Sequence, residues 1–192
     1  MVAVSWVGFD EPKSLGKVEY AKEWVQERVD EGRQVILAAH HREVVDAIAD
    51  SFGGLKIQGG MSAKEVEKVK QQFQAGAAPV ISLSIQAGKE GHTLTAASDV
   101  AFLEFPWTST DFDQTWGRAH RKGQKGTVFV TSFLGYNTLD TGHFDMLGRR
   151  RKTVQTATIG AADASAGVVL SLLQQGLDAT KPPDLSGGMS PG

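Results

Sequence analysis

Residues 34–42, QVILAAHHR, are the stretch that decides the fold class. Val35, Ile36 and Leu37 are apolar at consecutive positions, so a strand formed here would be buried on both of its faces. Such strands are typical of parallel sheets that helices cover on either side. Two histidines and Arg42 follow the apolar run, at the point where the strand would end.

Helical and strand-like segments alternate on both sides of this stretch. The patterns predict helices at 17–31, 44–52, after the capping box of Ser62 and Glu65, at 109–121 and at 139–153, and further strands at 55–57, 79–85, 100–105 and 127–134. This alternation predicts an α/β fold in which helices lie on both faces of a parallel sheet. Because ligands of such sheets bind at the carboxyl ends of the strands, we expect the site after Ala39, Ile85 and Phe105.

The composition is that of an ordinary soluble chain of 192 residues, with 41% hydrophobic residues and a net charge of −2. The charge excludes a bulk polycation, so any nucleic-acid contact must come from a local patch. The absence of cysteine excludes disulfides and thiolate metal sites. We see no signal peptide and no apolar run near the roughly 20 residues that span a bilayer. These features predict a soluble, cytoplasmic protein without a membrane partner.

The domain organisation follows from a shift in composition near Ala157. Residues 1–156 are expected to form one domain, and residues 157–192, rich in Ala, Gly and Ser, an extension with a short helix and a disordered tail. The basic run 149–152 before it has two interpretations. It is either a helix end favoured by the helix dipole or a phosphate contact.

The stretch 114–124, QTWGRAHRKGQ, carries the clearest chemistry. It places Arg118 and Arg121 three residues apart, and on a helix these would share one face. Two guanidinium groups on one face repel each other unless an anion lies beside them. A triphosphate fits best, because planar guanidinium groups match phosphate oxygens.

The same stretch resembles motif VI of superfamily 2 helicases and translocases, in the Swi/Snf-type pattern Q-x-x-G/D-R-x-H-R-x-G-Q. The resemblance implies a RecA-like second helicase lobe. It also implies that Arg121 is the arginine finger and Arg118 its neighbour on the ATP phosphates, with Gln114 and Gly117 near the nucleotide. The alternative is a solvated charged helix.

Residues 84–97, SIQAGKEGHTLTAA, resemble motif V of this family. The resemblance implies nucleotide contacts for Glu90 and Gly91. The DNA contacts that it implies are Ser84, Gln86, Lys89 and Thr95. Gln86 stands where the family usually has threonine. The alternative is an ordinary glycine-containing loop.

The opening stretch is similar to motif IV of the HepA-related, annealing-helicase branch. The resemblance implies that His40, His41 and Arg42 face DNA at the sheet edge. It gives Trp107, in the segment EFPWT, either a DNA contact or a packing role. Adjacent histidines can also indicate a metal, but no further ligands cluster nearby, and we predict no metal site.

One part of a nucleotide site is missing, since the chain contains no G-x-x-x-x-G-K-[ST] phosphate loop. In the resembled family that loop lies on a first RecA-like lobe, so ATP and Mg²⁺ would be held mainly by such a lobe, on the same parent protein or a separate chain. The sequence therefore predicts the C-terminal lobe of an ATP-dependent DNA helicase or translocase, acting on duplex or branched DNA and inactive as an ATPase alone. Two alternatives stay open: a non-hydrolysing DNA-binding or annealing module, and a protein-interaction scaffold with relic motifs.

Overall fold

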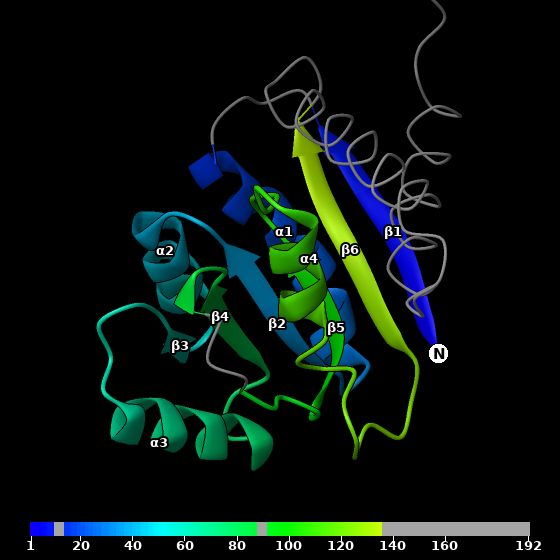
Figure 1. The fold of residues 1–192 in the computed structure, drawn as a ribbon. Helices are drawn as coiled ribbons and strands as arrows, with labels where there is room; N and C mark the ends of the chain where they lie inside the picture. Colours follow the sequence, from blue (N-terminus) through cyan, green and yellow to red (C-terminus); the bar gives the residue numbers. More distant parts are fainter. Residues whose placement is uncertain (10–13, 88–91, 136–192) are drawn as a thin grey trace, which may run out of the picture.

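Six parallel strands form one sheet in the part of the chain that the structure, a computed structural model, describes: residues 1–9, 14–87 and 92–135 (Figure 1). The elements in chain order are β1 (Val2–Phe9), α1 (Ser14–Asp30), β2 (Gln34–Ala39), α2 (Arg42–Phe52), β3 (Lys56–Ile57), α3 (Ala63–Gln74), β4 (Val80–Ser84), β5 (Ala97–Phe102), α4 (Ser109–Trp116) and β6 (Val128–Gly135). The strand order is β1-β6-β5-β2-β4-β3, and every neighbouring pair is parallel. The predicted α/β fold with a parallel sheet is confirmed.

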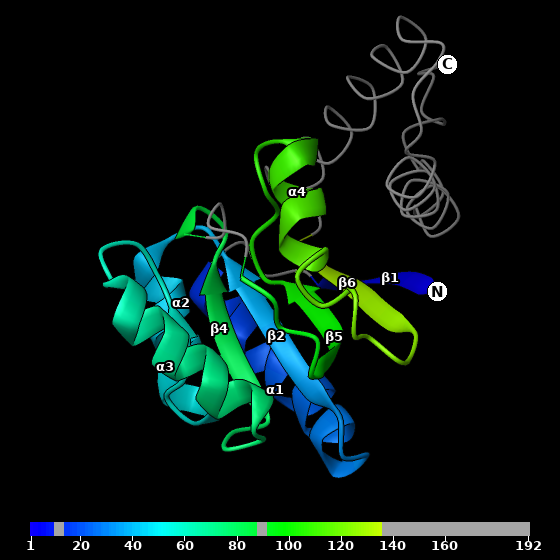
Figure 2. The ribbon, with the colours of Figure 1, turned by 60° about the horizontal axis from the view of Figure 1, so that its bottom comes forward.

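The central strand β2 divides the core into two halves, because successive side chains of a strand point to opposite faces. Val35 and Leu37 pack with α1 and α2, whereas Ile36 and Ala38 pack on the side of α3 and α4. Figure 2 shows the sheet between these two layers of helices. This arrangement explains why QVILAA is apolar at nearly every position.

Two local sequence signals mark helix ends, at the start of α3 and at the end of α1. Ser62 caps α3: its hydroxyl accepts a hydrogen bond from the Glu65 backbone, and the Glu65 carboxylate accepts one from the Ser62 backbone N–H. Gly32, with a φ of 72°, follows the last turn of α1 in the left-handed region that glycine favours.

Several predicted boundaries need correction. The strand β1 was not predicted at all, and the strand expected at 100–105 is β5, which spans Ala97–Phe102. The helix expected at 109–121 ends at Trp116. The helix predicted at 139–153 and the extension 157–192 lie outside the described residues. Within the described ranges, no helix is long and apolar enough to cross a membrane.

An aromatic stack fixes α4 on the sheet. The Phe112 ring, fully buried, lies 4.8 Å from the ring of Phe102 and 5.4 Å from that of Phe105, measured between centroids. Because α4 leads directly into the arginine-rich stretch, this stack sets where that stretch lies.

We expect Phe112→Ala to lower the free energy of unfolding by about 3–5 kcal/mol, since it leaves a cavity in the core. Urea denaturation followed by circular dichroism would measure this loss. The matched control is Phe129→Ala, because the Phe129 ring is 40% exposed. Equal losses in the two variants would contradict this role for the stack.

Candidate nucleotide and nucleic-acid sites

Residues 117–124, called the arginine loop from here on, leave the helical path directly after α4. At Gly117 the backbone passes so close to the preceding turn that an added Cβ would lie 2.7 Å from the Asp113 carbonyl oxygen. Beyond it, the Arg118 and Ala119 N–H groups bond three residues back, in turn geometry, to Thr115 and Trp116. The expectation that the two arginines share a helix face is therefore wrong.

Arg118 is buried, with only 1% of its surface exposed. One terminal nitrogen donates to the His92 carbonyl oxygen over 3.5 Å, and Nε has no hydrogen-bond partner among the described residues. No carboxylate of the described residues forms an ion pair with it. Burial, and secondarily the positive charge of Arg121, lowers the pKa of the Arg118 guanidinium to about 10. The guanidinium is still a cation at neutral pH. Burying its charge costs free energy, and a nearby anion would offset that cost.

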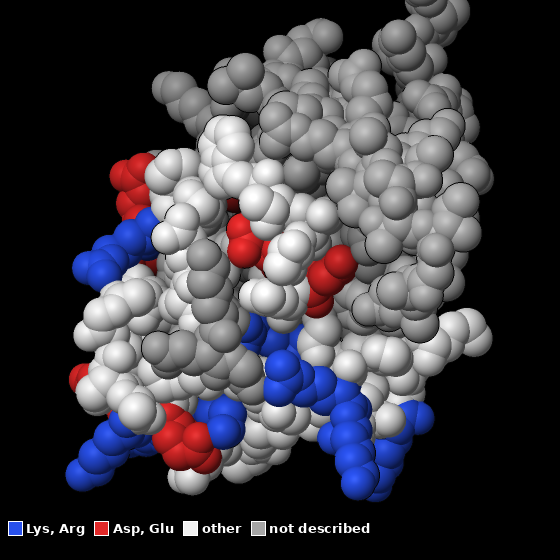
Figure 3. All heavy atoms as spheres, in the orientation of Figure 1, with Lys and Arg blue, Asp and Glu red and all other residues white. Residues whose placement is uncertain are grey.

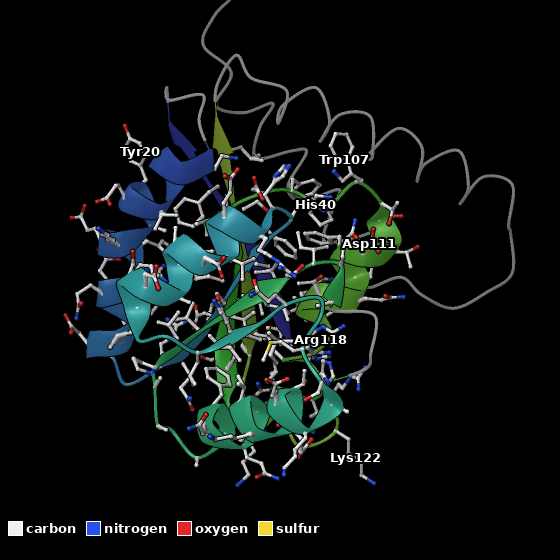
Figure 4. The ribbon with its side chains drawn as sticks, turned by 90° about the vertical axis from the view of Figure 1, so that its left-hand side faces the viewer. Tyr20, His40, Trp107, Asp111, Arg118 and Lys122 are labelled. Carbon is white, nitrogen blue, oxygen red and sulfur yellow. The ribbon has the colours of Figure 1, made fainter. Side chains whose placement is uncertain are left out.

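Arg121 lies beside Arg118 but is exposed. Its guanidinium donates to the Thr93 hydroxyl over 3.5 Å. The arginine loop thus carries one buried cation, Arg118, and one exposed cation, Arg121, rather than two cations on a single surface. Figure 4 shows Arg118 between α3 and α4, and Lys122 farther along, beside α3.

Gln124 anchors the arginine loop to the sheet. Its side-chain amide donates to the carbonyl oxygens of Thr95, Ala97 and Ala119, at 3.2, 2.8 and 3.3 Å. The Leu94 N–H donates to the Arg118 carbonyl oxygen in the same contact. The segment before β5 and the arginine loop therefore form one layer, which brings the motif V and motif VI stretches together.

The other predicted nucleotide residues are placed as follows. Gln114 is exposed on α4, one turn before Gly117. Glu90, Gly91 and the predicted DNA contact Lys89 lie outside the described residues.

Thr95, predicted to contact DNA, lies at the amino end of β5, away from Ser84 and Gln86. Its hydroxyl accepts a hydrogen bond from the Gln74 side chain of α3 over 3.2 Å. The structure thus separates Thr95 from the other residues predicted to contact DNA.

A second site lies at the opposite edge of the sheet, where β2, β3 and β4 end. A pocket of about 440 Å³ is lined there by His40, Arg42, Gln58, Gly59, Ser84, Gln86 and Ala87. We call it the carboxyl-edge pocket. It lies after Ala39 and Ile85, two of the three places where the sequence predicts the site; the third, after Phe105, does not contribute to the described lining. None of the described residues that line the pocket is acidic, and Arg42 gives the wall a positive charge.

The wall of the pocket is held by polar contacts. Arg42 donates to the Gly59 carbonyl oxygen over 2.6 Å, and the Gln86 side-chain nitrogen lies 3.4 Å from His40 Nε2. The Trp107 ring, 57% exposed, stands edge-on to His40 with 6.3 Å between centroids. Figure 4 shows His40 and Trp107 together at this end of the molecule.

His41 points away from the pocket lining, toward Glu104. Its Nδ1 lies 2.9 Å from a Glu104 carboxylate oxygen. Neither histidine belongs to a group of three or more potential metal ligands within the described ranges.

Basic side chains also gather on the face below α4, as Figure 3 shows. Arg121, Lys122 and Lys125 are the exposed basic residues of and beside the arginine loop. This local patch supplies positive potential that the net charge of −2 conceals.

Two residues that organise these sites received no role from the sequence. Gln124 is one fixed position of the motif VI pattern, and Glu104 lies in the segment EFPWT. The sequence offers one signal for Glu104: an acidic residue directly follows a buried apolar strand. Burying an isolated carboxylate there costs free energy, so a partner is expected.

Comparison with known proteins agrees with the fold and the motifs. Residues 16–123 match the family model of the helicase conserved C-terminal domain. A crystal structure of the C-terminal part of the Fun30 ATPase domain superposes with a TM-score of 0.65, covering 82% of this chain and 53% of that one. At 19% identity, that likeness concerns the fold alone.

Two curated relatives extend the comparison. The chain is 32% identical over 157 residues to a SWI/SNF-related matrix-associated actin-dependent regulator of chromatin subfamily A-like protein 1 of Drosophila melanogaster. It is 30% identical over 154 residues to the human DNA annealing helicase and endonuclease ZRANB3. These matches cover 79% and 77% of this chain but only 20% and 14% of the relatives. The predicted resemblance is confirmed: the chain belongs to the helicase C-terminal domain family, among the Swi/Snf-type proteins.

Proposed function

We propose that this lobe completes an ATP site whose phosphate loop lies on another RecA-like lobe, and that the assembled pair translocates on DNA. Arg121 acts as the arginine finger and Arg118 supports it on the phosphates. ATP and Mg²⁺ are held mainly by the other lobe, because this chain contains no phosphate loop.

The observation that carries the proposal is the buried guanidinium of Arg118. It has no carboxylate partner among the described residues, and its neighbour Arg121 is also positive. A buried cation in this state is stabilised by an anion from outside the fold. A phosphate group of a nucleotide offers the matching oxygens.

The nucleic-acid part of the proposal rests on the carboxyl-edge pocket. Arg42 and Ser84 offer hydrogen-bond donors, and the wall is free of acidic side chains as far as the structure describes it. Trp107 lies beside His40 with an exposed ring that can stack on a base or sugar. We propose that this pocket, with Gln86 and His40, contacts one DNA backbone. The human relative is named as a DNA annealing helicase, which supports DNA as the polymer.

The central test is ATP hydrolysis measured by phosphate release with DNA present. We expect no release above background from the chain alone, and turnover once a RecA-like lobe with a Walker motif is supplied from the parent protein or the neighbouring reading frame. In the reconstituted pair, Arg121→Ala should lower the turnover rate by about 10³-fold or more.

The matched control is Lys122→Ala, because Lys122 is an exposed cation in the next position. It should leave turnover within about threefold of the wild type, since a solvated charge contributes little. Robust hydrolysis by the chain alone would refute the split site. Undiminished turnover in Arg121→Ala would favour the scaffold hypothesis.

The DNA contact has a separate test in the salt dependence of binding. We expect Arg42→Ala to weaken duplex DNA binding by the chain about tenfold at low salt and to reduce the slope of log K against log salt by about one. Fluorescence anisotropy over a range of salt concentrations measures both quantities.

Lys22→Ala is the control for that measurement, since Lys22 is an exposed cation on α1, a helix that contributes no described residue to the carboxyl-edge pocket. It should change neither the affinity nor the slope. If Arg42→Ala and Lys22→Ala behave alike, the carboxyl-edge pocket is not the DNA site.

A further inference from the structure

Glu104 places a buried carboxylate against the turn between β2 and α2. One of its oxygens, Oε2, accepts hydrogen bonds from the backbone N–H groups of His40 and His41, each at 2.8 Å. The other oxygen, Oε1, lies 2.9 Å from His41 Nδ1. The residue itself is only 6% exposed. A carboxylate buried to this degree requires such charge-assisted hydrogen bonds.

These contacts cap α2 from the segment that follows β5. His41 is the N-cap residue of α2, and its own side chain forms no capping hydrogen bond. The first N–H groups of a helix have no partner within the helix, and negative charge there is favoured by the helix dipole. Glu104 supplies both the acceptor and the charge, although it lies 63 residues farther along the chain than His41.

The two segments that Glu104 joins are those proposed to meet DNA. The turn after β2 carries His40 and Arg42 on the wall of the carboxyl-edge pocket. The segment after β5 carries Trp107, whose ring lies beside that of His40. Hydrogen bonds of Glu104 thus link the two segments directly.

We propose that Glu104 is a positioning residue for nucleic acid: its carboxylate fixes the β2–α2 turn against the segment after β5, so that Arg42, His40 and Trp107 act as one surface. The proposal rests on the DNA contact proposed above. Glu104 itself does not line the pocket and touches no DNA in this account.

The experiment compares three variants of the full chain at a temperature where all are folded. Glu104→Leu keeps a similar volume but offers no acceptor, so the two backbone N–H groups lose their partner. Glu104→Gln keeps an oxygen that can accept from both N–H groups and an amide that can donate to His41 Nδ1, so it should preserve the arrangement. Val25→Ala creates a cavity at the buried face of α1 and serves as a control for lost stability alone.

Two readouts are measured for each variant: duplex DNA affinity by anisotropy, and the indole N–H resonance of Trp107 in ¹H–¹⁵N spectra. We expect Glu104→Leu to weaken binding about tenfold or more and to shift the Trp107 resonance, because bonds to a charged group are lost. Glu104→Gln should restore binding to within about threefold of the wild type, with the Trp107 resonance close to its original position. Val25→Ala should bind like the wild type with the Trp107 resonance unmoved.

The outcomes separate the two proposals. If Arg42→Ala weakens binding but Glu104→Leu leaves the affinity and the Trp107 resonance unchanged, the positioning role is refuted while the DNA contact stands. If Val25→Ala weakens binding as much as Glu104→Leu does, the loss follows from stability alone, the residue is merely structural and the proposal fails. If Arg42→Ala has no effect either, the DNA contact itself is refuted.

Discussion

The parallel pairing of β2 with β4 and β5 is the constraint on which the rest of the structure depends. Val35 to Ala39 align with Val80 to Ser84 on one side, and Val35 to Ala38 with Asp99 to Phe102 on the other. Parallel strands in register deliver their following residues to one edge. His40, Ile85 and Leu103 therefore begin neighbouring segments, and the carboxyl-edge pocket and the Glu104 contact both result from this alignment. Helices on the two faces are required by the same pairing, since both faces of β2 are apolar.

The arginine loop has a different physical basis. Nothing in the sheet requires a cation at Arg118, and Gln124 and the Leu94 N–H hold the loop through backbone carbonyl oxygens rather than through charge. Burial of Arg118 beside another cation opposes the folded state rather than supporting it. Positions that break a local rule in this way tend to be functional. The charge is understandable if an anion from outside the lobe is its intended partner.

The sequence was sufficient where local pattern and tertiary structure agree. The apolar run 35–37, the capping box at Ser62 and the glycine at 32 predicted elements that the structure contains. The polar residues after Ala39 were correctly expected at the sheet edge, and His40, Arg42, Ser84 and Gln86 do line one pocket.

The failures have a common cause, which is contact between residues distant in sequence. The strand β1 pairs with β6, where Val2 aligns with Val128, and no local signal carries that register. The helical pattern near Trp116 did not reveal the close backbone approach at Gly117. For the same reason, the motif grouped Thr95 with Ser84, although Ser84 lies at the carboxyl end of β4 and Thr95 precedes the amino end of β5. Glu104 received no role because its partners are more than 60 residues away.

The most direct measurement of the central claim is the free energy of unfolding of Arg118→Met, determined by urea denaturation against the wild type without nucleotide. Methionine keeps an unbranched, apolar side chain at the buried position and removes the charge. If the guanidinium is held for an outside phosphate, the variant should be as stable as the wild type or more stable by about 1 kcal/mol, because replacing an uncompensated buried charge is neutral or favourable. A loss of about 3 kcal/mol or more would show that the fold itself needs the Arg118 charge, and would contradict the account.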